Sequence, residues 1–377
     1  WMFGVEDGFD IVIGNPPYGN LLKEGEKKYV SKNYPYSTPS DISSPFVEKG
    51  ISLLKPQGQL FYVITFAITF NKKFYKNRKQ INETFEEAII YTFDRDRCEL
   101  FENMSQSVSI LMCIRKDSKE KQGIFTSRMF RSMPELNRST IEVSNCKEHL
   151  LPIGTNYNHE HRLPKIGEKI NLEILKTLKK NSKQVKTIIL EESENSKKLW
   201  IRTSGNYWYN AWDKKPYESS KIKAIFIEQL YYNFLLILTN SSLFYFWFRV
   251  YGDGRHMNYD IFEEIPIPEK EKVLKYSPLL SKTSQRFLNS LWSVFDKEHN
   301  RFLSSKIKHE VDLLDLILGR YLYNLTHDKI LHIMNYDFEV RGGIKLKEYE
   351  EIARKILNLT QSPDYETNKD KQAQVKE

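Results

Sequence analysis

Apolar residues occur along this chain in two patterns, as short continuous runs and as runs with helical spacing. Ile11, Val12 and Ile13 form a short β-branched run, which predicts a fully buried strand of a parallel sheet. Similar runs predict further strands at residues 60–65, 88–93, 108–114 and 124–130. Helical spacing predicts helices at residues 46–54, and at 74–81 continued by 83–87. This order of elements predicts an α/β fold that begins with a βαβ unit.

Beyond residue 160 the pattern changes. Residues 132–161 are loosely patterned and rich in turn formers, which places a domain boundary near residue 160. Periodicity then predicts a helix at residues 170–178 and a strand at 188–190, whereas residues 225–250 are apolar but too interrupted by Glu, Gln and Asn to span a membrane. We predict three regions: part of an α/β domain (1–160), a mixed α+β domain (161–270), and helices with a disordered tail (271–377).

The predicted first strand stops at Asn15, Pro16, Pro17 and Tyr18. Two prolines fix φ and remove two N–H donors, so the strand cannot continue through them. Ligands of open α/β sheets bind just beyond the carboxyl ends of strands, which makes this tetrapeptide a candidate site. A rigid turn is the alternative. The Lys-, Glu- and Asn-rich residues 18–36 that follow predict a loop, either closing over a substrate or simply solvated.

The tetrapeptide resembles the fourth motif of the amino-group DNA methyltransferases that use S-adenosylmethionine. In that motif Asp, Asn or Ser precedes Pro-Pro and an aromatic residue. The amine of adenine is a poor nucleophile because its lone pair is delocalised into the ring. The resemblance implies that the Asn15 side-chain oxygen and the Pro16 carbonyl accept hydrogen bonds from this amine and favour a pyramidal nitrogen. It also implies that Tyr18 stacks on the flipped base.

Two further phenylalanines match positions in the same methyltransferases. The helix at 46–54 and the Lys55-Pro56-Gln57-Gly58 turn are similar to the fifth motif region, where a phenylalanine packs on the adenine of the cofactor. The resemblance therefore implies that Phe46 and Pro17 bind S-adenosylmethionine. Phe101 matches the aromatic residue that holds the flipped base opposite the motif tyrosine. Simple core packing is the alternative for both phenylalanines.

The net charge of +8 and a pI near 9.0 fit a polyanionic partner such as double-stranded DNA, although many soluble proteins are equally basic. Aromatic, amide and cationic residues alternate in 199–209 and 244–259, a mixture that can read base edges and hold phosphates. The layout of residues 238–244, 252–258 and 265–268 resembles target-recognition domains of type II and type IIG restriction-modification methyltransferases. The candidate DNA-contacting residues are Arg202, Arg255 and His256, and Arg249 and Asn258 belong to the same set in 244–259. An aromatic core with solvated cations is the alternative.

Cysteine usage and the first residues bear on the compartment. The three cysteines are widely spaced and lack Cys-x-x-Cys or histidine partners, so neither a disulfide framework nor a metal site is expected. A reducing cytoplasm is the expected compartment. Residues 1–8 lack the pattern of a signal peptide.

The resembled methyltransferases carry a glycine-rich S-adenosylmethionine loop and an acidic ribose-binding residue upstream of the tetrapeptide, and we find neither in this sequence. The sequence therefore predicts the C-terminal part of a longer enzyme. The leading hypothesis is site-specific adenine-N6 methylation of DNA in a restriction-modification system, by base flipping and direct methyl transfer. The alternatives are a methyltransferase acting on protein glutamine or ribosomal RNA bases, and a DNA-binding specificity module or inactive fragment.

Overall fold

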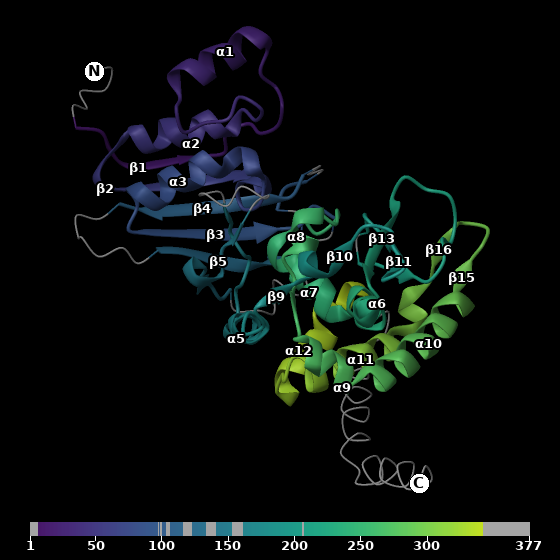
Figure 1. Cartoon of the computed structure of the whole chain (residues 1–377). Coiled ribbons are helices and arrows are strands. Elements are labelled where there is room, and N and C mark those ends of the chain that lie inside the picture. The colour runs from purple at the N-terminus through teal and green to yellow at the C-terminus, as the bar shows by residue number, and fades with distance from the viewer. Residues whose placement is uncertain are drawn as a thin grey trace, which may run out of the picture. The chain divides into compact units, whose positions relative to one another are not determined.

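The structure is a computed structural model that describes residues 7–96, 98, 100–102, 106–115, 123–132, 141–152, 161–205 and 207–341 (Figure 1). The chain divides into two compact units. The first comprises Trp1–Leu175 and Phe248–Asp253, and the second comprises Lys176–Trp247 and Gly254–Glu377. The short segment Phe248–Asp253 thus belongs to the first unit although both of its sequence neighbours belong to the second. The predicted disordered tail, and the part of the predicted helical region beyond residue 341, lie outside the described residues.

The first unit is built on a six-stranded mixed sheet with the order β1-β2-β4-β3-β5-β6 (Figure 1). β1 is parallel to β2, and β3 is parallel to β5, whereas β4 runs antiparallel to both β2 and β3. The strands are β1 (Phe9–Gly14), β2 (Leu54–Thr65), β3 (Glu87–Phe93), β4 (Val108–Ile114), β5 (Gly123–Phe130) and β6 (Ser144–Asn145). The strand at 108–114 has its predicted limits, and the other predicted strands are confirmed with shifted or longer bounds.

Helix α2 (Ser43–Ser52) packs on β2, and α3 (Tyr75–Thr84) packs beside α2. Because β1 and β2 are parallel and α2 lies between them in the chain, the predicted βαβ unit is confirmed. Asp41 helps α2 to begin, because its carboxylate accepts hydrogen bonds from the Ser43 backbone N–H (3.0 Å) and hydroxyl (2.7 Å). Gly50 lets the helix approach the sheet closely, since a Cβ there would lie 2.6 Å from the Tyr62 hydroxyl. Short pieces complete this unit: η1 (Phe66–Ile68), η2 (Lys72–Phe74), η3 (Lys147–His149), β7 (Leu151–Pro152), β8 (His161–Arg162) and the start of α5 (Lys169–Leu178).

Three predictions for the first unit are wrong. The helix expected to continue over residues 83–87 ends at Thr84, and Glu87 begins β3. The segment 18–36 is not all loop, because residues Glu24–Asn33 form helix α1, whose start is fixed by a 2.7 Å hydrogen bond from the Lys23 N–H to the Glu26 carboxylate. β1 is not fully buried either: Ile11 is 56% exposed and Ile13 79% exposed. Among the described residues β1 pairs on one side only, with β2, and its Phe9-Ile11-Ile13 face has no covering layer.

The second unit combines a small antiparallel sheet with helices. The sheet has the order β10-β13-β11-β12, formed by β10 (Ile189–Leu190), β13 (Ile222–Glu228), β11 (Ser196–Arg202) and β12 (Ala211–Trp212). The helices are α6 (Tyr232–Asn240), α7 (Ser242–Tyr251), α8 (Tyr259–Glu263), α9 (Lys270–Lys275), α10 (Ser277–Ser293), α11 (Lys308–Ile317), α12 (His327–Asn335) and α13 (Phe338–Arg341). Two-stranded pairs join β9 (Lys183–Gln184) to β14 (Pro266–Ile267) and β15 (Phe295–Asp296) to β16 (Arg301–Phe302).

The apolar segment 225–250 is packed core, as predicted, because α6 and α7 are buried on nearly every side. Within the described part of the chain, every helix is too short or too polar to cross a membrane. The general fold class, an α/β sheet followed by smaller sheets and helices, is confirmed. The three-region division at residues 160 and 270 stays a prediction.

A buried ionic cluster lies at α11. The Lys308 ammonium pairs with the Asp312 carboxylate and donates a 3.0 Å hydrogen bond to the Met334 carbonyl. Asp315 accepts a 3.0 Å hydrogen bond from the Leu243 backbone N–H. Burial raises the pKa of Asp315 to about 6, because the loss of water costs its charged form more than nearby Lys308 restores.

Candidate functional site

The carboxyl ends of four strands meet at one edge of the first unit's sheet. β1, β2, β3 and β5 all run in one direction, because β2 and β3 are both antiparallel to β4. Each strand delivers its following residues to this edge, and these residues begin with Asn15, Phe66, Asp94 and Arg131. Ligands of open α/β sheets bind at this edge. The tetrapeptide therefore lies where the fold class predicts a site.

Within the tetrapeptide, the four residues differ in exposure. Pro16 is buried and Tyr18 is partly buried, whereas Asn15 and Pro17 are exposed. Tyr18 packs against an apolar cluster of Phe93, Cys98, Val108 and Phe130, at the ends of β3, β4 and β5. The tyrosine is thus fixed at the sheet edge while the Asn15 amide stays accessible to a ligand.

Phe101 lies near the same cluster. Leu100, its neighbour, packs against the cluster that Tyr18 contacts, while Phe101 itself is 44% exposed. A second link joins the two segments: a Cβ on Gly19, which has a φ of +109°, would lie 3.8 Å from the Gln106 side chain. The structure therefore brings Tyr18 and the Leu100–Phe101 segment together, and leaves Phe101 too exposed for simple core packing.

Phe46 lies on the first turn of α2 and is 42% exposed. It lines a cavity of about 390 Å³ between α1 and α2. The walls are mostly apolar and aromatic, with Leu22, Tyr29, Val30, Tyr34, Ile42, Pro45 and the stems of Glu26 and Lys49. Pro17 is exposed but lies outside the described lining of this cavity, so the predicted pairing of Phe46 and Pro17 around one ring stays a prediction.

The candidate DNA-contacting residues of the second unit come from two adjacent segments. Residues 203–205 and 255–257 form a short antiparallel pairing, in which the Gly205 N–H donates to the Arg255 carbonyl (2.8 Å) and the Met257 N–H donates to Thr203 (2.9 Å). Arg202 ends β11 just before this pairing. Arg202 and Arg255 are partly buried, and His256 is exposed. The structure thus brings Arg202 close to the segment that holds Arg255 and His256, which lies more than fifty positions later in the sequence.

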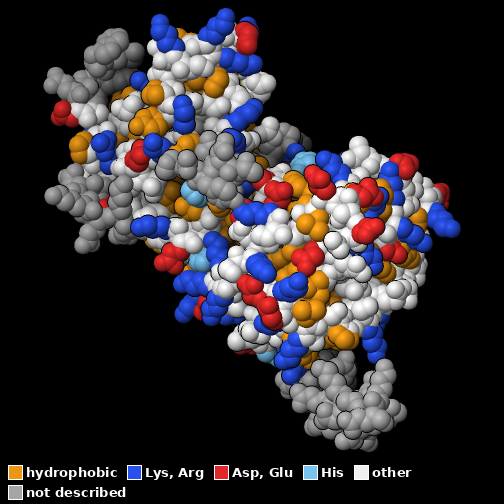
Figure 2. Space-filling view, viewed as in Figure 1, with side chains coloured by type: hydrophobic (Ala, Val, Ile, Leu, Met, Phe, Trp, Pro, Cys, Tyr) orange, Lys and Arg blue, Asp and Glu red, His pale blue; other side chains and the backbone are white. Residues whose placement is uncertain are grey.

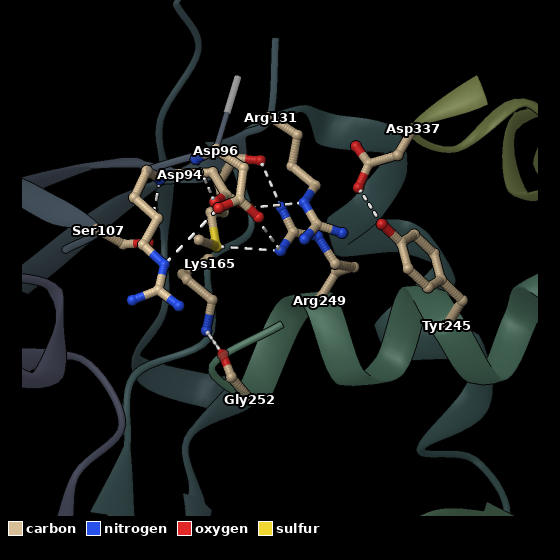
Figure 3. A network of polar contacts seen from close by, with 11 residues as sticks. Asp94, Asp96, Ser107, Arg131, Lys165, Tyr245, Arg249, Gly252 and Asp337 are labelled. Carbon is tan, nitrogen blue, oxygen red and sulfur yellow. Dashed lines mark hydrogen bonds and ion pairs between the residues drawn. The ribbon is translucent and has the colours of Figure 1, made fainter. Parts of the chain in front are cut away.

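The sequence reasoning missed a buried ionic network at the sheet edge (Figure 3). Asp94 accepts a 2.6 Å hydrogen bond from Arg131 Nε, and an Arg249 guanidinium nitrogen lies 4.0 Å from the same carboxylate oxygen. These three side chains are at most 3% exposed. Burial alone would raise the pKa of Asp94, but the two guanidinium groups hold it below its ordinary value.

Arg249 was predicted among the DNA-contacting residues, and that prediction is wrong. Its side chain is inside the first unit, where it donates hydrogen bonds to the sulfur (3.1 Å) and the carbonyl (3.2 Å) of Met129. The sequence held a usable signal: Arg249 is the one cation in an otherwise aromatic and aliphatic helix, 243–251. A cation in that position needs a buried partner.

Positive charge also gathers elsewhere on the first unit. Figure 2 shows Lys and Arg side chains over α1, at the top of the view, and the helix contains Lys27, Lys28 and Lys32. Three or more His, Cys, Asp or Glu side chains that could together hold a metal ion do not occur within the described ranges.

Part of the chain is similar in sequence to known proteins. Residues 1–98 match the Eco57I restriction-modification methylase family. The protein RM.MjaORFECS2P of Methanocaldococcus jannaschii, named as a candidate type II restriction enzyme and methyltransferase, is 38% identical over 77 residues, which are 20% of this chain and 6% of that protein. The type II methyltransferase M.BstVI of Geobacillus stearothermophilus is 28% identical over 123 residues, or 31% of this chain and 21% of that protein. The chain therefore spans only a small part of these relatives.

A solved structure is similar over a longer stretch. The type IIL restriction-modification enzyme MmeI in complex with DNA aligns with 92% of this chain and 57% of its own chain, at 12% identity and a TM-score of 0.42. The sequence match to the methylase family covers β1, α1, α2, β2, α3 and β3, and so includes the tetrapeptide.

Proposed function

We propose that this chain is the C-terminal part of a site-specific DNA methyltransferase of a restriction-modification system, and that it methylates the N6 amine of adenine. The placement of Asn15, Pro16, Pro17 and Tyr18 carries the proposal. They follow a parallel strand at the carboxyl edge of the sheet, and Tyr18 shares an apolar cluster with the Leu100–Phe101 segment. The match of residues 1–98 to restriction-modification methylases supports it.

The tetrapeptide suits an amine substrate because it offers hydrogen-bond acceptors. The target amine donates one hydrogen to the Asn15 side-chain oxygen and the other to the Pro16 carbonyl. Both contacts draw the nitrogen out of conjugation with the ring and aim its lone pair at the incoming methyl group. Pro16 is buried and ring-locked, so its carbonyl is held in place before the substrate arrives.

The base must leave the duplex to reach these acceptors. Tyr18 stacks on one face of the flipped adenine, and Phe101 supplies the second face. Their different surroundings fit this task, since Tyr18 is fixed against the apolar cluster whereas Phe101 is nearly half exposed. Each base–aromatic contact contributes about 1 to 3 kcal/mol, which offsets part of the cost of unstacking.

S-adenosylmethionine supplies an electrophilic methyl group when bound. The exposed ring of Phe46 and the apolar walls of its cavity fit the flat adenine end of this cofactor, and exposed Pro17 is available beside the substrate acceptors. Phe46, the walls of its cavity and Pro17 would contact only the adenine end of the cofactor. The remaining contacts to the cofactor are proposed to come from a preceding region of the same enzyme, which would also supply a strand at the open edge of β1 and a separate layer over Ile11 and Ile13.

Double-stranded DNA is the proposed partner of the second unit. Arg202, Arg255 and His256 lie around one backbone pairing and can donate to phosphate oxygens or to base edges. The net charge of +8 favours a polyanion.

The substitution Asn15→Ala tests the proposal in the enzyme that includes its preceding coding region. We expect the rate of label transfer from S-adenosylmethionine to DNA to fall by about 10²- to 10³-fold, because one preorganised polar contact to the reacting group is lost. DNA affinity should not change. The matched control Asn82→Ala, on the exposed face of α3, should keep the rate.

The products separate the alternatives. N6-methyladenine in digested DNA supports the proposal, and N4-methylcytosine would correct its base specificity. Label on protein or ribosomal RNA, with none on DNA, would favour the two other methyltransferase hypotheses. DNA binding without any methyl transfer, in the wild type and in Asn15→Ala alike, would favour a specificity module.

A further inference from the structure

The connection from β3 to β4 carries Leu100 and Phe101, and Asp94 anchors its start. The Asp94 N–H donates to the Phe130 carbonyl (2.9 Å), and its carboxylate accepts from the Asp96 N–H (3.2 Å). The far end of the connection is tied to the same place, because the Arg95 N–H donates to the Ser107 hydroxyl (3.3 Å). The Asp94 carboxylate therefore helps to fix the first described residues of this connection.

Two arginines from distant segments hold that carboxylate. Arg131 follows β5 and donates directly, while Arg249, from the last turn of α7, contributes its charge at 4.0 Å (Figure 3). Arg249 also holds the end of β5 through Met129. The Asp94 carboxylate is 3% exposed, so it keeps its charge only with such partners. A shift of Arg249 should therefore disturb the position of the Asp94 side chain, and a shift of Asp94 should disturb Arg249.

The segment Phe248–Asp253 is fixed to the first unit at more points than Arg249. The Lys165 ammonium donates to the Gly252 carbonyl (2.9 Å; Figure 3), and the Lys165 N–H donates to the Val250 carbonyl (2.9 Å). The Tyr251 hydroxyl donates to the His149 carbonyl (2.8 Å). The six residues Phe248–Asp253 thus belong to the first unit, where they contact Met129, His149 and Lys165, although the chain on either side of them belongs to the second unit.

The residues directly after this segment are the proposed DNA-contacting ones. Arg255 follows Asp253 by two positions and is paired with residues 203–205. Arg255 lies six residues after Arg249 in one continuous stretch of chain. Bound DNA that displaces Arg255 can therefore act on Arg249 through the backbone between them, and Arg249 lies beside Asp94.

We propose that Asp94 and Arg249 are positioning residues that couple the loop after α7 (residues 252–255, here called the recognition loop) to the Leu100–Phe101 segment. DNA that carries the recognition sequence then promotes capture of the flipped base. This inference rests on the proposed function. It adds that base capture depends on the recognition loop through one buried ion pair, in addition to the direct contacts of each site with DNA.

The test measures base flipping separately from binding, in the enzyme with its preceding region. DNA carries 2-aminopurine at the target adenine, and its fluorescence rises when the base leaves the stack. Asp94→Asn keeps the acceptor for the Asp96 N–H but removes the charge. We expect the fluorescence rise at saturating DNA and kcat to fall about tenfold, while KM for DNA and affinity for S-adenosylmethionine change less than twofold.

A second, milder variant guards against misfolding. Tyr251→Phe removes only the hydrogen bond to His149, and should lower the fluorescence rise in the same direction by a smaller factor. The matched control is Asp312→Asn, which breaks a buried ion pair of the second unit. It should lower the melting temperature without lowering the fluorescence rise.

A double substitution tests the coupling itself. Arg255→Ala should reduce the fluorescence rise in the wild-type background and have little further effect in Asp94→Asn, because the path is already broken. Independent, additive losses would overturn the inference, as would an unchanged fluorescence rise in folded Asp94→Asn and Tyr251→Phe. A wild-type enzyme that neither flips the base nor methylates DNA would instead overturn the proposed function, and this inference with it.

Discussion

Neighbouring residues of the tetrapeptide have opposite surroundings, and this contrast fits their proposed roles. Asn15 is exposed and can reach a ligand, whereas Pro16 is buried and offers only its backbone carbonyl. A turn that served only to end β1 would need the prolines but would not need an amide beside them. The presence of Asn15 before the two prolines therefore favours a binding role over a simple turn.

Asp315 illustrates a single residue that affects stability through its charge. Its pKa of about 6 in the folded chain exceeds its ordinary value of 3.8, so the folded form binds the proton more tightly. The contribution of Asp315 to the free energy of unfolding should therefore be largest below pH 4 and fall as the pH rises towards 6. Asp315→Asn should remove this decline, on the order of 2 kcal/mol, while keeping an acceptor for the Leu243 N–H.

Urea unfolding between pH 4 and pH 7 provides the measurement for Asp315. The exposed Asp7→Asn serves as the control and should leave the pH dependence unaltered. An identical decline with pH in the wild type and in Asp315→Asn would show that another group causes it.

At the scale of single elements, the fit of α2 against β2 depends on a missing side chain. Gly50→Ala would place a Cβ 2.6 Å from the Tyr62 hydroxyl and 2.9 Å from the Leu60 side chain, so the helix or the strand must shift. We expect this change to lower the free energy of unfolding by about 1 to 3 kcal/mol. Tyr62→Phe should restore part of the loss, because it removes the nearer atom.

Gly25→Ala on α1 is the matched control for that prediction. A Cβ at Gly25 meets no atom within 4 Å, so the same substitution should stabilise the helix by about 0.5 to 1 kcal/mol. Denaturant titration of Gly50→Ala, of Gly50→Ala combined with Tyr62→Phe, and of Gly25→Ala would measure these changes in the free energy of unfolding. Equal effects at Gly50 and Gly25 would mean that helix propensity, and not close packing, governs both.

The elements also differ in how far the sequence alone predicts them. The strand Val108–Ile114 has its predicted bounds, because six of its seven residues are apolar and leave few alternatives. Helix α1 was missed because its only buried side chain is Val30, so it lacks an apolar stripe. β1 was identified as a strand, but its burial was not, since a strand's own residues do not show whether another layer covers them.

At the scale of the whole molecule, the placement of the site was partly predictable. The apolar run before the tetrapeptide placed it at the carboxyl end of a strand, and the resemblance alone placed Phe101 opposite Tyr18. The Asp94–Arg131–Arg249 network could not, because its members are up to 155 positions apart and only the folded chain brings them together. The assignment of Phe248–Asp253 to the first unit was equally hidden, since patterning yields only contiguous regions.

Net charge also acts at this scale, and it predicts the response of DNA binding to salt. If about five phosphates are neutralised, affinity should fall roughly 500-fold between 50 and 200 mM salt, because bound counterions are released. Fluorescence anisotropy with mixed-sequence DNA measures this dependence. Arg202→Ala should reduce the slope by about one if Arg202 contacts a phosphate. A flat response to salt would argue against DNA as the partner.

The open side of β1 has a consequence for handling this chain in solution. An unpaired strand edge is a template on which a strand of another molecule can add, and here Phe9, Ile11 and Ile13 lie in alternation along it. Growth along the strand stops at Pro16 and Pro17, which lack N–H donors, and Asp10 adds a charge near the start. This edge thus makes the chain susceptible to concentration-dependent aggregation, so colloidal stability should improve when another strand occupies it.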